Sequence, residues 1–452
     1  MSKQGIVLDS GNCDTAIRAS IFHFLADPNQ RPDAFEYIDD GMLILKQGKV
    51  SALGEAHSLL KQLPDGTKLH DYSGKLLMPG LIDTHTHYPQ TEMIACYGAQ
   101  LLEWLEKYTF PTERQFSDRQ YAERAADFFC DQLLRNGTTT SAVFATIHPE
   151  SVDAIFSAAQ QRNMCLIAGK VMMDRNAPDY LCDTAESSYT QSAELIERWH
   201  QKGRAHYAVT PRFAPTSSEQ QLEAAGQLLK DFPNLYLQSH LAENHAEVAW
   251  VAKLFPHRRS YLDVYDHYGL LAERSVYGHC IHLDDTDRQR MAESGAAIAF
   301  CPTSNLFLGS GLFSVEDASR KNIRIGVATD VGGGTSFSLL QTLNEAYKVS
   351  QMSGQNLTSL NAFYLATLGG AKSLYLDGEL GNFAVGKQAD FVVLDLQATP
   401  IMERRMARAD SIEDQLFALM MLGDDRCVHA THIMGRCQYQ INAETLPFSE
   451  VP

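Results

Sequence analysis

Two histidines one residue apart are the first side chains in this sequence that could hold a metal ion. They belong to the segment Asp-Thr-His-Thr-His at 83–87, within an apolar run that begins at Leu81. On an extended strand alternating side chains point the same way, so His85 and His87 can reach one ion together. The same pattern also fits two ordinary histidines at the exit of a strand.

Further candidate ligands follow later apolar runs. His240, His279 and Asp330 come at the ends of the fifth, sixth and eighth runs. If the runs are parallel strands of one barrel, their carboxyl ends meet on a single face, which is where this fold places its active sites. Three histidines and one carboxylate, with room for a water, suit Zn²⁺ or Fe²⁺. The set therefore predicts a metal site.

A carboxylate is expected beside this metal site. Glu243 follows His240 by three residues, where the chain leaves the fifth strand. A metal ion lowers the pKa of a bound water toward neutrality, and Glu243 could take the proton and pass it to a departing amine. The structural alternative is a carboxylate at a helix N-terminus, where the helix dipole favours negative charge.

The elements that must position these residues are short apolar runs, rich in β-branched residues, which alternate with longer amphipathic segments. Strands alternating with helices predict a parallel sheet, and eight such units predict an α/β fold with a closed (β/α)₈ TIM-type barrel. An open doubly wound sheet is the alternative. The expected strands are 81–86, 138–144, 165–172, 205–210, 235–239, 275–278, 296–300 and 324–329, and the expected helices are 117–135, 149–163, 187–202, 217–230, 244–254 and 285–294.

The two ends of the chain differ from this middle part. Residues 1–74 contain short β-like pieces separated by turns, and residues 378–452 begin with a strongly β-like segment at 391–396. Neither end is long enough to form a stable domain alone. We expect them to pack together as one small β-sandwich domain beside a barrel of residues 75–377.

Composition narrows the classes of protein that fit. The chain of 452 residues has a formal net charge of −17, which disfavours binding to nucleic acid phosphates or to an anionic membrane. The longest uncharged stretch, 295–315, contains Pro302 and several polar residues and cannot span lipid. The first ten residues lack the apolar core of a secretory signal. Nine cysteines without any C-x-x-C pair indicate reduced thiols in the cytoplasm.

Several motifs resemble those of a known family. The segment Pro-Gly-Leu-Ile-Asp-Thr-His-Thr-His at 79–87 resembles the opening signature of the amidohydrolase superfamily, in its triazine-hydrolase-like branch. Residues 381–391 resemble the segment by which such enzymes return to their β domain. Within the superfamily, the guanine deaminase family is the nearest likeness, and it extends over nearly the whole chain. The segments similar to that family are 87–90, 102–105, 110–113, 210–216 and 301–305.

This resemblance implies a role for each candidate residue. One Zn²⁺ per chain, or Fe²⁺ in its place, would be held by His85, His87, His240 and Asp330. The catalytic residues would be Glu243, Asp330 and His279, the last of which orients the water. The residues implied to contact substrate are His87, Gln90, Arg212, Phe213, His240, Glu243 and Asp330.

The resemblance also implies an activity. A zinc-bound hydroxide would deaminate guanine hydrolytically to xanthine and ammonia in purine catabolism, so the partners expected are guanine and water, within a cytoplasmic homodimer. A related mononuclear deaminase or chlorohydrolase, acting on a pterin, pyrimidine or triazine ring, is the runner-up.

Other kinds of protein fit the sequence less well. A two-metal hydrolase would need Lys170 as a carbamylated bridge. Another deaminase architecture needs H-x-E with P-C-x-x-C, and only His-Ala-Glu at 245–247 is present. We expect His245 and Glu247 to be exposed residues on the helix after the fifth strand. A barrel scaffold without metal would lack ligands that this chain retains.

Overall fold

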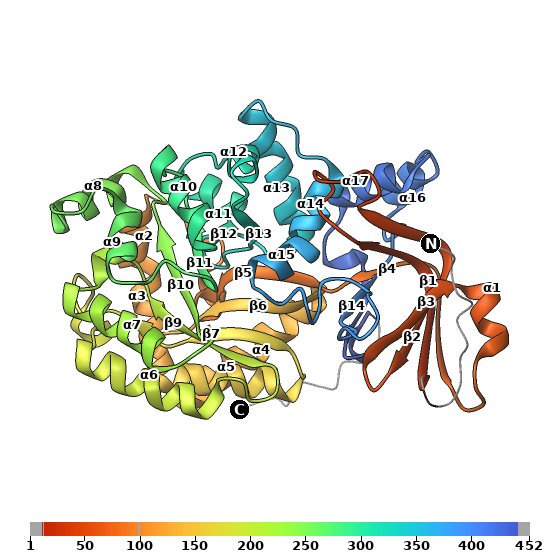
Figure 1. Ribbon diagram of the computed structural model, residues 1–452, viewed down its shortest axis with the longest axis horizontal. Coiled ribbons are helices and arrows are strands. Elements are labelled where there is room, and N and C mark those ends of the chain that lie inside the picture. The colour runs from red at the N-terminus through yellow and green to blue at the C-terminus, as the bar shows by residue number, and fades with distance from the viewer. Residues whose placement is uncertain (1–10, 12, 98–99, 442–452) are drawn as a thin grey trace.

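The computed structural model describes residue 11 and the ranges 13–97 and 100–441. Two sheets organise these residues: a barrel surrounded by helices, and a smaller sheet built from both ends of the chain (Figure 1). The first ten residues, where no secretory signal was expected, lie outside the described part, as do the outer ends of the two expected flanking segments.

The eight expected strands are all present, and they form a parallel barrel. Each pairs with the next along the chain, apart from the short strand β8 (Val171–Met172), which adds to β9. Thr84 Oγ1 donates to Val327 O at 3.0 Å and Asp330 N donates to His85 O at 2.9 Å, which brings the end of the last strand back to the first and excludes an open doubly wound sheet. The strands are β5 (Leu81–His87), β6 (Thr138–Phe144), β7 (Cys165–Gly169), β9 (Ala205–Pro211), β10 (Tyr236–Leu241), β11 (Ser275–His279), β12 (Ala297–Phe300) and β13 (Arg324–Val327).

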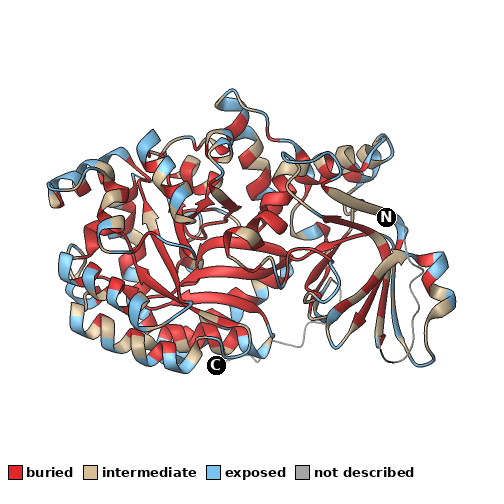
Figure 2. Cartoon of the chain, viewed as in Figure 1, coloured by how far each residue is buried: buried red, intermediate tan, exposed pale blue. Residues whose placement is uncertain are grey.

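Helices cover the outside of this barrel. Their inner faces are buried against the strands and their outer faces are exposed (Figure 2). Side-chain caps fix several starts; for example, Asp118 Oδ1 accepts from Tyr121 N at 3.0 Å where α4 begins. The six expected helices are α4 (Arg119–Arg135), α5 (Pro149–Gln161), α6 (Ala185–Trp199), α7 (Glu219–Asp231), α8 (His245–Leu254) and α10 (Asp285–Ser294).

Further helices connect the barrel strands or cover the small sheet. They are α1 (Ala56–Leu59), α2 (Leu101–Trp104), α3 (Phe110–Glu113), α9 (Tyr261–His267), α11 (Pro302–Phe307), α12 (Val315–Arg320), α13 (Leu339–Met352), α14 (Ser359–Leu365), α15 (Leu368–Ser373), α16 (Pro400–Met406) and α17 (Ile412–Leu422). None of the helices in the described ranges is both long enough and apolar enough to span a membrane.

The small β domain expected from the two chain ends is present. Hydrogen bonds join its strands in the order β16-β15-β14-β4-β1-β2-β3, so the expected sandwich is one continuous mixed sheet. Its central strand β4 pairs parallel with β1 and antiparallel with β14, and it runs into the barrel strand β5. The strands are β1 (Thr15–Phe24), β2 (Phe35–Lys46), β3 (Lys49–Glu55), β4 (Lys68–Pro79), β14 (Phe391–Leu394), β15 (Val428–Ile433) and β16 (Arg436–Gln440).

The hydrophobic core supports the end of the barrel where the candidate ligands lie. A large apolar cluster fills the space between strands and helices, and a second one, with Ile82, Ala142 and Ile167 among its members, packs residues from facing strands. Side chains at these positions fill the barrel, as is usual for this fold. The strands are therefore rigid supports for the residues at their carboxyl ends.

Candidate active site

Four side chains predicted as metal ligands converge at the carboxyl end of the barrel. His85 and His87 end strand β5, His240 lies on β10, and Asp330 follows β13; their ligand atoms all lie within 4.8 Å of one another. His87 Nε2 is 3.2 Å from both His85 Nε2 and His240 Nε2. Asp330 Oδ1 is 3.2 Å from His85 Nε2 and 3.3 Å from His87 Nε2.

These distances fit a tetrahedral metal site. Ligand atoms about 2.0 Å from a tetrahedral Zn²⁺ lie about 3.3 Å from one another. Three imidazole nitrogens and one carboxylate oxygen are also a donor set that zinc and iron accept. The side chains of this cluster therefore fit the ion in both chemistry and spacing.

Protonation states in the cluster also suit a cation. Burial lowers the pKa of His87 to about 3, and it lowers the pKa of His240 well below its usual value, so both imidazoles are neutral and keep a lone pair. Burial alone would raise the pKa of Asp330, but hydrogen bonds from His85 and His87 hold it well below its ordinary range. One negative charge thus faces two neutral imidazoles.

Neighbouring groups fix the orientation of these ligands. His240 Nδ1 lies 2.7 Å from the carbonyl oxygen of Arg212, so this nitrogen carries the proton and Nε2 faces the cluster. Asp83 Oδ1 accepts from the backbone N–H of Thr329 at 3.1 Å and of His85 at 3.3 Å. Burial raises the pKa of Asp83 to about 7. Asp83 therefore ties the first ligand strand to the residue before Asp330.

The backbone at the site is held in a conformation that non-glycine residues seldom adopt. Ala242, His279, Cys280 and Asp330 have φ values of 49°, 69°, 54° and 49°. Such residues cost about 1–3 kcal/mol each and persist only where surrounding contacts fix them. One such contact is the hydrogen bond from Cys280 N to Leu241 O at 2.9 Å. Four of the fourteen described non-glycine residues with positive φ therefore lie at strand ends that carry the site.

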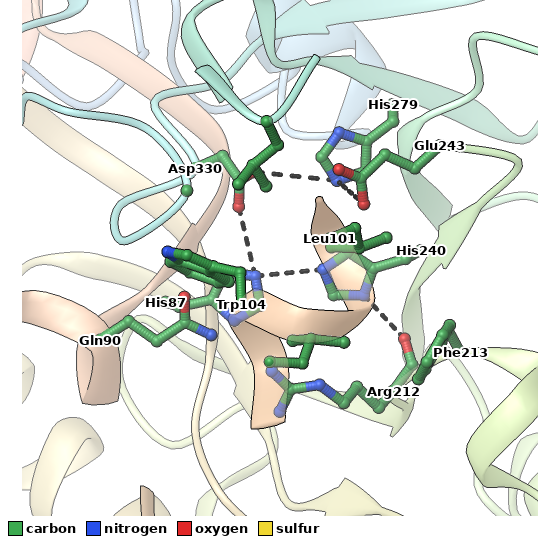
Figure 3. A pocket seen from close by; sticks show the side chains of 13 residues that line it. His87, Gln90, Leu101, Trp104, Arg212, Phe213, His240, Glu243, His279 and Asp330 are labelled. Carbon is green, nitrogen blue, oxygen red and sulfur yellow. Dashed lines mark hydrogen bonds and ion pairs between the residues drawn. The ribbon is translucent and has the colours of Figure 1, made fainter. Parts of the chain in front are cut away.

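Glu243 and His279 lie together on one side of the cluster (Figure 3). His279 Nε2 is 3.5 Å from Glu243 Oε2 and 3.8 Å from Asp330 Oδ2. His279 Nδ1 lies 2.8 Å from Asn305 Oδ1, and Ser310 Oγ donates to Glu243 Oε1 at 2.9 Å. Burial and the charge of Asp330 raise the pKa of Glu243 to about 8. A carboxyl group with such a pKa can both accept and donate a proton near neutral pH.

A pocket opens onto this arrangement. It brings together all seven residues expected to contact substrate. Trp104 lines it from α2. The lining residues are His87, Gln90, Leu101, Trp104, Leu105, Arg212, Phe213, His240, Glu243, His279, Leu308, Asp330 and Gly333.

On the side of the pocket away from Glu243, two polar side chains share one carboxylate. Arg212 Nη1 is 2.8 Å from each oxygen of Glu113, and Gln90 Nε2 donates to Glu113 Oε1 at 3.2 Å. All three side chains are buried. The pocket thus has an acid–base group at one end and hydrogen-bonding groups for a ligand edge at the other.

Several supporting residues were not predicted from the sequence. Asp83 and Glu113 lie in motifs that carry the family resemblance, but no role was predicted for them, and no local pattern joins Ser310 or Asn305 to their partners. Glu247, expected to be exposed on the helix after the fifth strand, is fully buried. The expectation was wrong because Glu247 Oε2 accepts from Asn244 N at 3.1 Å, in a capping box that begins with Asn244. The spacing Asn-x-x-Glu could have revealed it.

Other candidate residues have structural surroundings. Lys170 is fully buried in an ion pair with Asp183. Its amine therefore contacts Asp183 and not the residues of the metal-ligand cluster, which agrees with a structural role. Cys301 lies near His85, His279 and Asp330, but burial raises the pKa of its thiol well above the usual value. A protonated thiol is a poor ligand. All nine cysteines are free.

Comparison with known proteins defines the class to which this barrel and site belong. A model of the amidohydrolase family matches residues 76–437. The chain therefore belongs to the amidohydrolase family.

The similar proteins are more specific. The guanine deaminase of Escherichia coli K12 is 54% identical over 430 residues, which cover 94% of this chain and 98% of that protein. The solved structure of the E. coli guanine deaminase has a TM-score of 0.93 and covers 95% of this chain and all of that chain. The guanine deaminase of C. acetobutylicum, solved with guanine in its active site, is 28% identical with a TM-score of 0.85 and covers 94% of this chain and all of that one. These similarities place the chain beside the guanine deaminases within its family.

Proposed function

We propose that this chain catalyses the hydrolytic deamination of guanine to xanthine and ammonia. The observation that carries the proposal is the pocket, in which the histidine–aspartate cluster and Glu243 lie opposite the pair Arg212 and Gln90. The similarity to guanine deaminases along nearly the whole chain supports the choice of substrate.

We assign His85, His87, His240 and Asp330 as the ligands of one Zn²⁺ per chain, with Fe²⁺ as the alternative. A divalent ion at this position supplies a Lewis acid that makes water a nucleophile near neutral pH. The spacing of the four ligand atoms and the neutral state of His87 and His240 support this assignment.

Glu243 moves the protons of the reaction. Its carboxylate accepts a proton from the water that attacks C2 of the purine and gives it to the neighbouring ring nitrogen, N3. It then takes the remaining proton of the hydroxyl that is now bonded to C2 and passes it to the leaving amine. The amino group departs as ammonia while the oxygen of the water remains on C2. His279 faces both Glu243 and Asp330, so these groups together orient the attacking water.

The remaining lining residues hold the base. Arg212 donates to the purine carbonyl oxygen, Gln90 satisfies the adjacent ring edge, and Phe213 packs against the ring. The aromatic and aliphatic side chains Trp104, Leu101 and Leu308 enclose the apolar surface of the base. Desolvation of this kind strengthens the polar contacts inside.

The experiment that tests this function is guanine-dependent release of ammonia by the purified protein. Adenine and cytosine are assayed in parallel, and a chelator-treated sample serves as control. We expect ammonia from guanine alone, loss of activity on chelation, and recovery on addition of Zn²⁺. A zinc-loaded protein that releases no ammonia from guanine would contradict the substrate and direct the search to pterins, pyrimidines and triazines.

We further propose that the enzyme is a homodimer that works in the cytoplasm in purine catabolism. The family resemblance supports dimerisation, and nine free cysteines support a reducing compartment. We place the boundaries of the barrel at residues 75 and 377, which limited proteolysis can test. Sedimentation velocity measures the oligomeric state directly.

A further inference from the structure

Glu113 is a buried carboxylate that connects the two side chains proposed to hold the base. It lies at the end of α3, in the segment between β5 and α4, and is fully buried. Both of its oxygens accept from Arg212 Nη1 at 2.8 Å, and Oε1 also accepts from Gln90 Nε2 at 3.2 Å. Two substrate-facing groups therefore take their orientation from one residue that does not line the pocket.

The contact with Glu113 determines which end of the Gln90 amide faces the pocket. An ionised carboxylate only accepts hydrogen bonds, so the group that meets it must be the NH₂ of Gln90. Gly332 limits the amide from another side, since a Cβ at Gly332 would lie 2.5 Å from Gln90 Oε1. No described residue donates a hydrogen bond to that oxygen, and Gln90 lines the pocket. Gln90 thus offers a ligand an acceptor.

The same contact determines what Arg212 offers. Glu113 binds Nη1 and balances the guanidinium charge, while no described residue accepts from Nε or Nη2. Arg212 and Gln90 lie on the same side of the pocket, below His87 and His240 in Figure 3. Because both contact Oε1 of Glu113, their polar ends converge. The pocket therefore presents a donor next to an acceptor.

This pattern complements one chemical group, a lactam edge, in which a ring N–H stands next to a carbonyl. We propose that Glu113 is a positioning residue that makes the site select 2-amino heterocycles with a lactam edge. The inference rests on the proposed function and extends it, because it names the residue that sets specificity. In guanine the edge is N1–H with the C6 carbonyl. In 2-aminopurine N1 carries a lone pair and C6 has no oxygen.

Glu113→Gln tests the proposal with minimal change in volume. A glutamine can present either its oxygen or its NH₂, so Gln90 becomes free to turn over and offer a donor to the N1 lone pair of 2-aminopurine. We measure kcat/KM for guanine and 2-aminopurine. The wild type should prefer guanine by at least about 10²-fold, since a site built for a polar group rejects analogues that lack it. In the variant, the ratio of kcat/KM for guanine to that for 2-aminopurine should be at least about tenfold lower, mainly because KM for guanine rises.

A binding measurement separates this inference from the proposed reaction. Hypoxanthine has the lactam edge without a 2-amino group, and purine has neither, so their dissociation constants from the zinc-loaded protein report the edge without turnover. The wild type should bind hypoxanthine at least about tenfold more tightly than purine, and Glu113→Gln should reduce that preference to about threefold or less. If guanine is not deaminated but this preference is seen, only the reaction is wrong.

Two further variants control for folding. Glu113→Asp keeps a carboxylate and should retain more of the preference than Glu113→Gln. Asp390→Asn breaks another carboxylate–arginine pair away from the pocket, that of the buried Asp390 with the partly buried Arg204, and should lower the unfolding temperature without changing either ratio. Equal ratios in the wild type and Glu113→Gln, with zinc content unchanged, would overturn the proposal.

Discussion

The carboxylate of Glu247 accepts a hydrogen bond from the backbone N–H of Glu243 at 2.8 Å, so one buried glutamate fixes the main chain that carries another. The backbone N–H of Asn244 donates to the same oxygen at 3.1 Å, and Tyr261 donates to the other oxygen at 2.8 Å. All of these groups are buried. The position of the proposed proton carrier therefore depends on the first turn of α8.

Replacing Glu247 by an apolar residue should disturb this support. Glu247→Leu leaves the N–H groups of Glu243 and Asn244 without an acceptor, at about 1–3 kcal/mol for each buried group. If this cost is relieved by movement of the loop, kcat should fall about ten- to a hundredfold. Stopped-time ammonia assays give kcat, and metal content should be unchanged. Glu247→Gln is the matched control, because it keeps an acceptor and should retain most of the activity. Equal activity of Glu247→Leu and wild type would refute the role.

The same residue should make stability depend on pH in the metal-free protein. Burial, then the charge of Glu243, raises the pKa of Glu247 from 4.5 to about 7. Between these values the folded state binds more protons than the unfolded state, so the free energy of unfolding falls as pH rises. The contribution is complete below pH 4.5 and is lost by about pH 7. Urea unfolding of the chelated protein at a series of pH values should show a steeper decline for wild type than for Glu247→Gln. Parallel profiles would exclude this shift.

Removing the proposed proton carrier should separate catalysis from metal binding. Glu243→Gln keeps the size of the side chain and leaves His85, His87, His240 and Asp330 intact. We expect kcat to fall by about 10²–10⁴, the usual contribution of a general acid–base group, while zinc content measured by plasma emission stays the same. Near-normal turnover in this variant would mean that another group carries the proton.

The glycine after Val331 should be required for substrate binding. At Gly332, with φ of 135°, an added Cβ would lie 2.5 Å from both Cβ and Oε1 of Gln90. Gly332→Ala should therefore displace the Gln90 amide and raise KM for guanine about tenfold, the cost of one hydrogen bond. Gly386→Ala is the control: its φ is 91°, but its Cβ would meet no atom within 4 Å. If both variants have the same KM, the contact with Gln90 is not the cause.

The main features of the fold could be predicted because they follow from periodic patterns. Eight apolar runs gave eight barrel strands, and the rule that parallel strands end on one face brought His87, His240 and Asp330 together. The two chain ends were also expected to form one small β domain, as a sandwich. They do form one domain, and hydrogen bonds join its strands into a single sheet. These features depend on local sequence and on topology alone.

The supporting contacts could not be predicted in the same way. Arg212 and Glu113 are 99 residues apart, and Ser310 and Glu243 are 67 apart, so no local spacing relates them. Their pairing depends on how the segment 101–117 and the loop after α11 fold over the pocket. Glu247 is a different case, because its capping pattern, Asn-x-x-Glu, can be recognised in the sequence, whereas its burial cannot. Burial of a charged residue depends on the complete set of neighbours.

The place of β4 in the small sheet sets an order for biosynthesis. β4 pairs with β1 on one side and with β14 on the other, and the whole barrel lies between β4 and β14 in the sequence. The ribosome must therefore synthesise the whole barrel before β14, the second partner of β4, exists. Until then β4 presents an unpaired strand edge, the kind of surface that recruits other chains. Translation that stops within the barrel would leave this edge open permanently, so truncated products should aggregate.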